Sequence, residues 1–204
     1  MKLIIGTYRK QQYLPDTLKS IHKHVTGIDK IVFVDDSDDV HTHLWELERG
    51  DVISTGKSGY NAAMKAVCEA AGDEPFCFWE EDFQALEPID LDELGEQLAA
   101  KPHLAQLALL RGPWFPIEHQ HGGLIEALEA KGEQFDLIDG ILEQTVTFTC
   151  NPSVWQAGVA AAGWPDGEWS EERKRDELLA AGYKFGFVPG IKVTHGGIRS
   201  GFGY

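Results

Sequence analysis

The strongest candidate for chemistry in the sequence is a run of three adjacent carboxylates, Glu80, Glu81 and Asp82. Adjacent carboxylates repel one another, so they need either a cation or full solvation. The run follows the apolar segment Phe76–Trp79 directly, which favours a place at the end of a buried strand. Hard carboxylate oxygens suit Mg²⁺ or Mn²⁺, ions that proteins often share with substrate phosphates. The run therefore predicts either a divalent metal site or a solvated acidic loop.

Two further polar groups follow apolar runs in the N-terminal half. Thr7–Arg9 comes after the run at 3–5, and Asp35 and Asp36 come after the run at 30–34. Hydroxyl, aromatic and cationic groups at a strand end suit a base, a ribose or a phosphate, although a polar surface turn has the same composition. The chain has no Gly-x-Gly-x-x-Gly fingerprint and no complete Walker-type phosphate loop, so dinucleotide and ATPase functions are disfavoured.

The C-terminal half offers a second set of titratable groups. Glu171 and Glu172 open a predicted helix, where carboxylates interact well with the helix N-terminus, or where one of them acts as a general base. His195 follows a predicted strand, and a lone histidine there is more often structural than a ligand. Three His-x-His pairs, at 22/24, 41/43 and 119/121, lack further zinc ligands at recognisable spacing.

The elements that must position these groups alternate along the first hundred residues. Strands are predicted at 3–5, 30–34, 51–54 and 76–79, and helices at 15–24 and between Gly59 and Gly72. This alternation predicts an α/β sandwich around a mostly parallel sheet. Ligands bind beyond the carboxyl ends of the strands in such sheets, and both acidic groups fall at those ends.

The second half of the chain has a less regular pattern. We predict helices at 91–100, 124–130 and 171–181, and a further helix that begins at Pro152. Strands are predicted at 104–110, 145–149, 185–188 and 191–194. Residues 112–116 read as a rigid aromatic loop, because Gly and Pro flank the aromatic pair Trp114 and Phe115.

Composition excludes several classes of protein. The 204 residues carry 18 Lys and Arg against 33 Asp and Glu, a net charge of −15, and eleven of the carboxylates lie within residues 66–100. A chain this acidic is a poor partner for nucleic acid or an anionic bilayer. No segment approaches the roughly 20 apolar residues of a membrane span. Three cysteines without metal-ligand spacing suggest reduced thiols in a cytoplasmic protein.

The order of these motifs resembles that of the family 2 glycosyltransferases with the GT-A fold. The segments that carry the resemblance are Ile5–Arg9 with Leu14–Ile21, Ile31–Ser37, Gly59–Ala63, Phe78–Asp82, Ser170–Glu172 with Leu178–Lys184, and Val188–His195. Three departures occur. The metal motif reads Glu-x-Asp rather than Asp-x-Asp, the first turn lacks its usual asparagine, and the late motif reads Glu-Glu rather than Glu-Asp.

The resemblance implies a single-domain, Rossmann-like GT-A sandwich over residues 1–204, with a nucleotide-binding half at 1–100 and an acceptor and catalytic half at 101–204. It implies a metal-dependent inverting hexosyltransferase that uses Mn²⁺ or Mg²⁺ and a nucleoside-diphosphate sugar, most typically a UDP-sugar. The implied metal ligands are Asp82, Glu80 and His195. The implied general base is Glu172, or failing that Glu171, with Asp176 as a further candidate. The implied nucleotide-binding residues are Thr7, Tyr8, Arg9, Asp35, Asp36, Gly59, Asn61 and Glu81.

Three alternatives remain open. A sugar-nucleotide pyrophosphorylase has a related sheet, but its triphosphate loop needs more than the single glycine, Gly6, found after the first strand. A non-catalytic domain that binds sugar nucleotides or glycans would explain the altered metal motif. A zinc hydrolase would use the histidine pairs. The acceptor is undefined and could be a protein side chain, a glycan or a small molecule; Trp114, Trp164 and Trp169 are candidates to stack on it or on the donor sugar.

Overall fold

The computed structural model describes residues 1–8 and 11–197, and Arg9 therefore lies outside the described residues. Four parallel strands form the N-terminal part of the sheet: β4 (Asp51–Ser54), β3 (Lys30–Asp35), β1 (Lys2–Thr7) and β5 (Phe76–Glu80), in that order. Leu3, Ile4 and Ile5 are all fully buried, because helices cover both faces of this part of the sheet. A continuous apolar run is typical of such parallel strands.

The sheet continues with strands from the second half of the chain. Beyond β5 the order is β11 (Ser153–Trp155), β8 (Leu104–Arg111), β12 (Lys184–His195), β10 (Ile141–Gln144) and β9 (Asp136–Ile138), and β6 (Phe83–Ala85) pairs with β12. Because β11 is antiparallel to both β5 and β8, the strands β8 and β12 run in the same direction as β1 and β5. Most strands therefore point the same way, and the predicted α/β fold class is confirmed.

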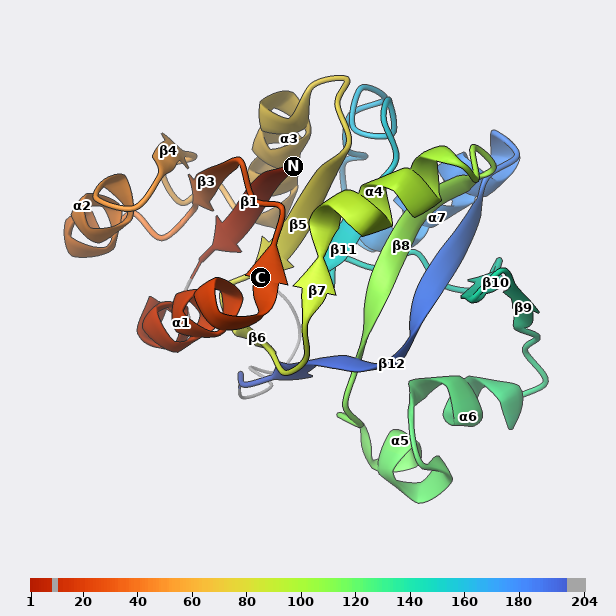
Figure 1. Ribbon diagram of the computed structural model, residues 1–204. Coiled ribbons are helices and arrows are strands. Elements are labelled where there is room, and N and C mark those ends of the chain that lie inside the picture. The colour runs from red at the N-terminus through yellow and green to blue at the C-terminus, as the bar shows by residue number, and fades with distance from the viewer. Residues whose placement is uncertain (9–10, 198–204) are drawn as a thin grey trace.

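Helices form a layer on each face of the sheet (Figure 1). The helices are α1 (Leu14–His24), α2 (Val40–Leu47), α3 (Tyr60–Ala71), α4 (Leu91–Ala99), α5 (Pro116–His121), α6 (Leu124–Glu129) and α7 (Ser170–Ala180). A 3₁₀ turn, η1 (Gln11–Tyr13), precedes α1, and the short strands β2 (Val25–Thr26) and β7 (Ile89–Asp90) form a separate two-stranded sheet. One core, with Leu18 and Leu98, lies under α1 and α4, and a second, with Val67 and Leu178, lies under α3 and α7. The helices α5 and α6 lie together beyond the end of β8.

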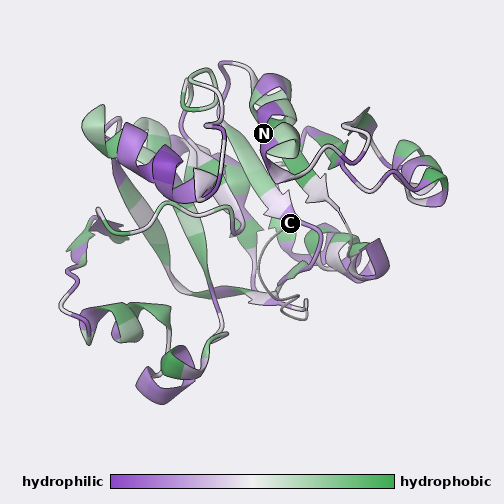
Figure 2. Ribbon diagram, turned by 180° about the vertical axis from the view of Figure 1, so that it is seen from behind, coloured by the Kyte–Doolittle hydropathy of each residue, from purple (hydrophilic) through white to green (hydrophobic). Residues whose placement is uncertain are grey.

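The second core is built around an aromatic cluster. Trp155 of β11 packs against Phe76, Phe148 and Trp164 at ring-centroid distances of 5.1, 4.9 and 6.2 Å. Such pairs add about 0.5–1.5 kcal/mol each beyond the burial of their area. The cluster fixes the loop that contains Phe148 and thereby holds residues 149 and 150 beside the start of α7. Figure 2 shows the hydrophobic central strands behind α7, whose outer face is strongly hydrophilic.

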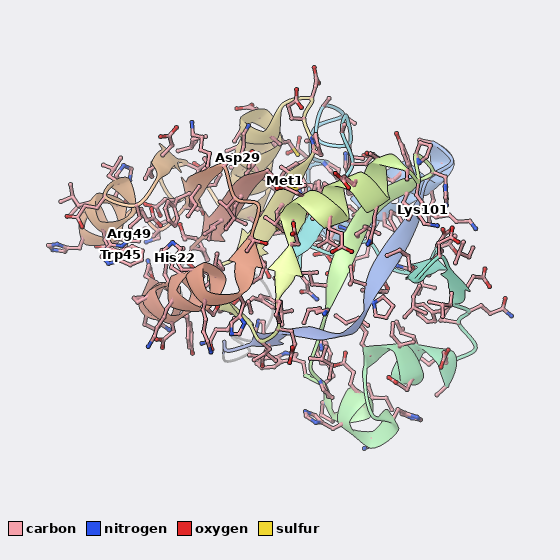
Figure 3. The ribbon with its side chains drawn as sticks, in the orientation of Figure 1. Met1, His22, Asp29, Trp45, Arg49 and Lys101 are labelled. Carbon is pink, nitrogen blue, oxygen red and sulfur yellow. The ribbon has the colours of Figure 1, made fainter. Side chains whose placement is uncertain are left out.

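The N-terminal amine also takes part in the fold. It donates to Asp29 Oδ2 at 2.7 Å and to the carbonyl of Gly27 at 2.5 Å, and Met1 and Asp29 lie near each other in Figure 3. This contact ties the start of β1 to the loop before β3. Among the described residues, no helix is both long and apolar enough to cross a membrane.

Two predicted elements are wrong. Residues 145–149 form a loop rather than a strand, because the Gln144 side chain bonds the backbone of this segment: its Oε1 accepts from the amides of Val146 and Thr147, and its Nε2 donates to the Thr147 carbonyl. Pro152 does not begin a helix. It precedes β11, whose apolar residues Val154 and Trp155 fill the slot between β5 and β8.

Other boundaries and elements differ from the prediction. The segments predicted as strands at 185–188 and 191–194 form one strand, β12, with irregular register around Val188 and Ile191. The helices α2 and α5 were not predicted; α2 begins directly after the acidic residues that follow β3, and α5 begins at Pro116, the last residue of the predicted aromatic loop. The histidine pairs 41/43 and 119/121 therefore lie on helices, as 22/24 does, and residues two apart on a helix face different directions. This geometry disfavours the zinc hydrolase.

Candidate functional site

A cavity lies at the carboxyl ends of β1 and β5, against α3. It is partly open to solvent, and its empty space, which includes the open solvent at its mouth, amounts to about 450 Å³. The residues that line it are Gly6, Thr7, Tyr8, Asp36, Tyr60, Ala63, Met64, Val67, Phe78, Glu80, Glu81 and Asp82. Six nucleotide-binding or metal-binding positions were predicted in the segments after β1 and β5. Five of them, Thr7, Tyr8, Glu80, Glu81 and Asp82, border this one space, together with Asp36 from the end of β3.

Glu81 organises the turn that follows β1. Its Oε2 accepts from the Tyr8 amide at 2.8 Å, its amide donates to the Gly6 carbonyl at 3.2 Å, and its carbonyl accepts from the Thr17 hydroxyl at 2.6 Å. These bonds link the end of β5 to the end of β1 and to α1. The predicted ligand-binding residue Glu81 thus also has a structural role, because it sets the backbone of the turn that carries Tyr8.

The two aspartates at the end of β3 have different surroundings. Asp36 lines the cavity, and its two oxygens accept from the Gly59 amide, at 2.9 Å, and from the Thr55 hydroxyl. Asp35 is fully buried away from the cavity lining; its Oδ1 accepts from the Ser37 amide at 2.7 Å, and His43 Nδ1 lies 3.3 Å from its Oδ2. Asp36 is therefore the aspartate that faces the ligand space.

The start of α3 connects the cavity to the loop before α7. Gly59 precedes the helix with φ 93°, a conformation that favours glycine. Asn61 Nδ2 donates to the Gly167 carbonyl at 2.9 Å, and Lys65 pairs with Asp166 at 2.6 Å. The predicted nucleotide-binding residue Asn61 therefore holds the 166–167 turn beside the cavity, which brings the first turn of α7 toward the same region.

Asp82 and His195 meet at the ends of β5 and β12. Asp82 Oδ2 lies 3.2 Å from His195 Nε2, and the Asp82 side chain is only 2% exposed. The Gly196 amide donates to the Asp82 carbonyl at 2.7 Å. A Cβ on Gly197 would lie 2.0 Å from Asp82 Oδ2, so a side chain at position 197 would displace this carboxylate.

The Asp82–His195 pair fits a divalent ion. Two ligands at right angles on an octahedral ion, each about 2.1 Å from it, lie roughly 3.0 Å apart, close to the observed 3.2 Å. Carboxylate and imidazole are common ligands of first-row divalent ions. Among the described residues no group of three His, Cys, Asp or Glu side chains is close enough to hold a metal. Glu80 lines the cavity without completing such a group, so further ligands would have to come from substrate and water.

Glu171 has the properties of a base near neutral pH. Loss of hydration on burial raises its pKa, hydrogen bonds from Cys150 and Thr149 lower it, and the charge of Glu172 raises it, with a result of about 7. The pKa of the Tyr60 hydroxyl is raised well above its usual value, first by burial and then by charges that include Glu171 and Glu80. Glu171 is thus within electrostatic reach of a ring that lines the cavity.

The other two candidate bases lie in different surroundings. Glu172 is exposed on the first turn of α7. Asp176 is also exposed and pairs with the neighbouring Arg175, whose Nη2 lies 2.8 Å from Asp176 Oδ1. None of the three candidate side chains lines the cavity, so burial and the raised pKa distinguish Glu171 from the other two. The structure therefore favours Glu171, the second choice from the sequence, over Glu172 and Asp176.

A further buried carboxylate, Glu46 on α2, belongs to no motif that sequence patterns could have marked. Its side chain is 0% exposed, and neither oxygen accepts a hydrogen bond of good geometry from the described residues. Burial raises its pKa to about 8; the nearby Thr7 hydroxyl lowers it, and the charges of Asp35 and Glu81 raise it further. Glu46 therefore keeps its proton at neutral pH, beneath the cavity rather than in it.

Comparison with solved structures identifies the fold as that of the GT-A glycosyltransferases. A mannosyltransferase from Pyrobaculum calidifontis, in complex with GDP-Man and Mn²⁺, matches 98% of this chain with a TM-score of 0.67 at 15% identity. The crystal structure of GalNAc-T7 with UDP, GalNAc and Mn²⁺ matches 99% of it with a TM-score of 0.67 at 13% identity. At these identities the likeness shows the fold alone.

The chain spans 58% of the mannosyltransferase and 44% of GalNAc-T7, about half the length of each. No protein-family model matches the sequence, and no curated protein sequence matches it. The activity must therefore be argued from the site itself.

Proposed function

We propose that the protein is a metal-dependent inverting glycosyltransferase that moves a hexose from a nucleoside-diphosphate sugar to an acceptor hydroxyl. The observation that carries the proposal is the contact of Asp82 with His195, 3.2 Å apart at the rim of a cavity at the strand ends. Both positions were expected as metal ligands from the sequence. In both structural neighbours a nucleotide and Mn²⁺ are bound, which supports the same ligand classes here.

The nucleotide would occupy the cavity lined by Thr7, Tyr8 and Asp36. Asp36 would accept a hydrogen bond from a ring N–H of the base, since it faces the cavity and Asp35 does not. A carboxylate has about four acceptor positions, so the bonds from Gly59 and Thr55 leave room for one more. We favour a UDP-sugar, and Arg9, Gly59 and Asn61 complete the proposed nucleotide-binding set.

A divalent ion, Mn²⁺ or Mg²⁺, would be held by Asp82 and His195, with Glu80 nearby on the cavity wall. Such an ion supplies Lewis-acid neutralisation of the negative charge that develops on a leaving diphosphate. In a chain with a net charge of −15, a bound cation also offsets the repulsion between the protein and an anionic donor.

Glu171 would take the proton from the acceptor hydroxyl. A pKa of about 7 leaves a large share of this carboxylate ionised at neutral pH and still makes it a stronger base than an ordinary glutamate. Direct displacement at the anomeric carbon requires such a base on the acceptor side, and Glu171, on the first turn of α7, is within electrostatic reach of Tyr60 on the cavity wall. Glu172 is the reserve candidate.

In this proposal the N-terminal half of the chain binds the nucleotide, and the C-terminal half supplies the base and a metal ligand. All residues that line the cavity lie within 6–82, whereas Glu171 and His195 come from the half at 101–204. Of the tryptophans proposed to stack on substrate, Trp164 is buried and Trp169 is 70% exposed, so Trp169 suits an acceptor better. The three cysteines are unpaired and buried, in agreement with a reducing, cytoplasmic setting.

A panel of UDP- and GDP-sugars tests the proposal. The protein is incubated with each donor and Mn²⁺, and release of nucleoside diphosphate is measured with and without a chelator. We expect release from at least one donor, its loss with chelator, and its loss in Asp82→Asn. The control is Glu143→Gln, since Glu143 is an equally buried carboxylate, 2% exposed, on β10.

The other outcomes separate the alternatives. Formation of nucleoside triphosphate and sugar 1-phosphate when inorganic pyrophosphate is added to the donor, without release of nucleoside diphosphate, indicates a pyrophosphorylase. Tight binding of a nucleotide sugar without turnover, measured by calorimetry, indicates a non-catalytic binding domain. If Asp82→Asn turns over donor as fast as the wild type, the proposed metal site is wrong.

A further inference from the structure

Asp82 contacts one nitrogen of the His195 ring, Nε2, whereas the other side of the ring is held by packing rather than by a hydrogen bond. A histidine that binds a metal usually donates its second ring N–H to an oxygen, which fixes the ring. His195 Nδ1 is buried and has no such partner in the part of the chain that the structure describes. Instead, the ring lies between Phe83, at a centroid distance of 4.7 Å, and Trp114, at 4.0 Å. The position of Trp114 therefore decides where His195 Nε2 points.

Trp114 in turn belongs to the loop between β8 and α5, and this loop is held by one carboxylate. Glu118 Oε2 accepts from the Trp114 amide at 2.7 Å and from the Phe115 amide at 3.1 Å. Glu118 lies on α5 and is only 2% exposed. Its side chain thus bends the loop back onto the helix and fixes the backbone at Trp114.

Arg111, the last residue of β8, holds Glu118 in place. Its guanidinium makes two parallel bonds to the carboxylate, of 2.6 and 2.8 Å, and Nη1 also donates to the Gly112 carbonyl at 3.1 Å. Both partners are buried, and a buried bidentate pair has a well-defined geometry. The Gly112 amide donates to the Val193 carbonyl at 3.1 Å, which ties the same loop to β12 two residues before His195.

We propose that the Arg111–Glu118 ion pair is a positioning device for the candidate metal site, and that it acts on His195 through Trp114. Arg111 and Glu118 touch neither the cavity nor Asp82. The ion pair fixes the backbone of the loop at Trp114, and the position of the Trp114 indole in turn fixes the orientation of the His195 imidazole. The consequence for metal binding rests on the proposed function, whereas the control of the His195 ring does not.

The test uses Glu118→Gln, which keeps the shape of the side chain and removes its charge. The matched control is Glu143→Gln, because Glu143 is also 2% exposed and also accepts from two basic side chains, His103 at 2.9 Å and Lys101 at 3.3 Å. That cluster contains Lys101, which Figure 3 labels far from the C-terminal end of β12. A third variant, Trp114→Ala, leaves the ion pair intact and removes the ring that contacts His195.

Two measurements are made on each folded protein. The first is the NMR signal of the His195 ring protons, which the Trp114 ring current displaces in the wild type. The second is the affinity for Mn²⁺ in the presence of UDP or GDP, measured by calorimetry. We expect Glu118→Gln and Trp114→Ala to shift the His195 signal and to weaken Mn²⁺ binding roughly tenfold, as loss of a supporting residue usually does. Glu143→Gln should change neither.

The outcomes are distinguishable from those of the proposed function. An unchanged His195 signal in Glu118→Gln overturns the positioning role, and if that variant does not fold, an unchanged Mn²⁺ affinity in Trp114→Ala does so. A shifted signal with unchanged Mn²⁺ affinity also overturns it, since orientation would then not matter for the metal. If the wild type itself binds no Mn²⁺, the proposed metal site fails, while the shifted signal still supports control of the ring.

Discussion

Glu46 and Glu171 are two carboxylates with raised pKa values on opposite sides of the strand ends, and they differ in what surrounds them. Glu46, on α2, is fully buried and lacks a well-formed hydrogen bond. Burial and the nearby charges of Asp35 and Glu81 raise its pKa to about 8. Glu171 is half-buried at the start of α7 and accepts hydrogen bonds from Cys150 and Thr149, and its pKa is about 7.

The difference shows that burial alone does not make a catalytic base. Hydrogen-bond donors lower the cost of ionising Glu171, so that this carboxylate can lose its proton near neutral pH. Glu46 has no comparable compensation and stays neutral, so it can serve only the structure. A site must therefore combine partial desolvation, donors to the ionised form and access to substrate.

The largest effect on activity should come from replacing Glu171, the carboxylate that hydrogen-bond donors support. Glu171→Gln removes the proposed base with little change of shape, so the rate of sugar transfer should fall by about 10²–10⁴-fold. The affinity for the nucleotide donor, measured by calorimetry, should stay within twofold of the wild type, because Glu171 does not line the nucleotide cavity. Equal losses of binding and turnover would instead mark Glu171 as a structural residue.

Replacing the enclosed carboxylate, Glu46, should change the stability of the protein and leave its activity unchanged. The folded-state pKa of Glu46 lies above its ordinary value of 4.5, so the folded protein keeps a proton that the unfolded chain releases. Its contribution to stability is present below pH 4.5 and is lost as the pH rises toward 8. The loss from this one group amounts to about 3 kcal/mol between pH 5 and pH 8.

Glu46→Gln should remove that part of the pH dependence. The measurement is the free energy of unfolding in urea at pH 5, 6.5 and 8, as a difference from the wild type. Glu48→Gln, on the same helix but 73% exposed, is the control and should leave the pH dependence unchanged. A wild-type slope that persists in Glu46→Gln would mean that this carboxylate is already ionised in the folded protein.

The smallest effect should come from the neighbour of the proposed base. The charge of Glu172 raises the pKa of Glu171, so Glu172→Gln should lower it. A base must be ionised to act, and the rising limb of the pH–rate profile should therefore move to lower pH by a fraction of a unit, with little change in the maximal rate. A large loss of maximal rate would reverse the two assignments and make Glu172 the base.

Much of the fold and part of the site could be predicted from the sequence. Buried parallel strands require apolar runs such as Leu3–Ile5, and polar residues that follow these runs necessarily gather at one edge of the sheet. For that reason Thr7, Asp36 and Asp82 could be assigned to one region before their contacts were known. The fold class followed from the same alternation of strands and helices.

The rest depends on contacts that leave no local pattern. A side chain, Gln144, bonds the backbone at residues 146 and 147, and this bonding overrides the β propensity of a Thr- and Val-rich segment. The choice between Glu171 and Glu172 depends on donors at 149 and 150, some twenty residues earlier in the chain. Glu46 and the Arg111–Glu118 pair are single residues whose burial is decided by tertiary packing alone.

The central proposal is that Asp82 and His195 together hold a divalent ion beside a nucleoside diphosphate, and Mn²⁺ binding to the wild type, Asp82→Asn and His195→Ala tests it most directly. Mn²⁺ is titrated calorimetrically into each protein with UDP or GDP present. We predict one site in the wild type and a loss of affinity of at least tenfold in each variant. Equal Mn²⁺ affinity in all three proteins, or no Mn²⁺ binding by the wild type with either nucleotide, would contradict the proposal.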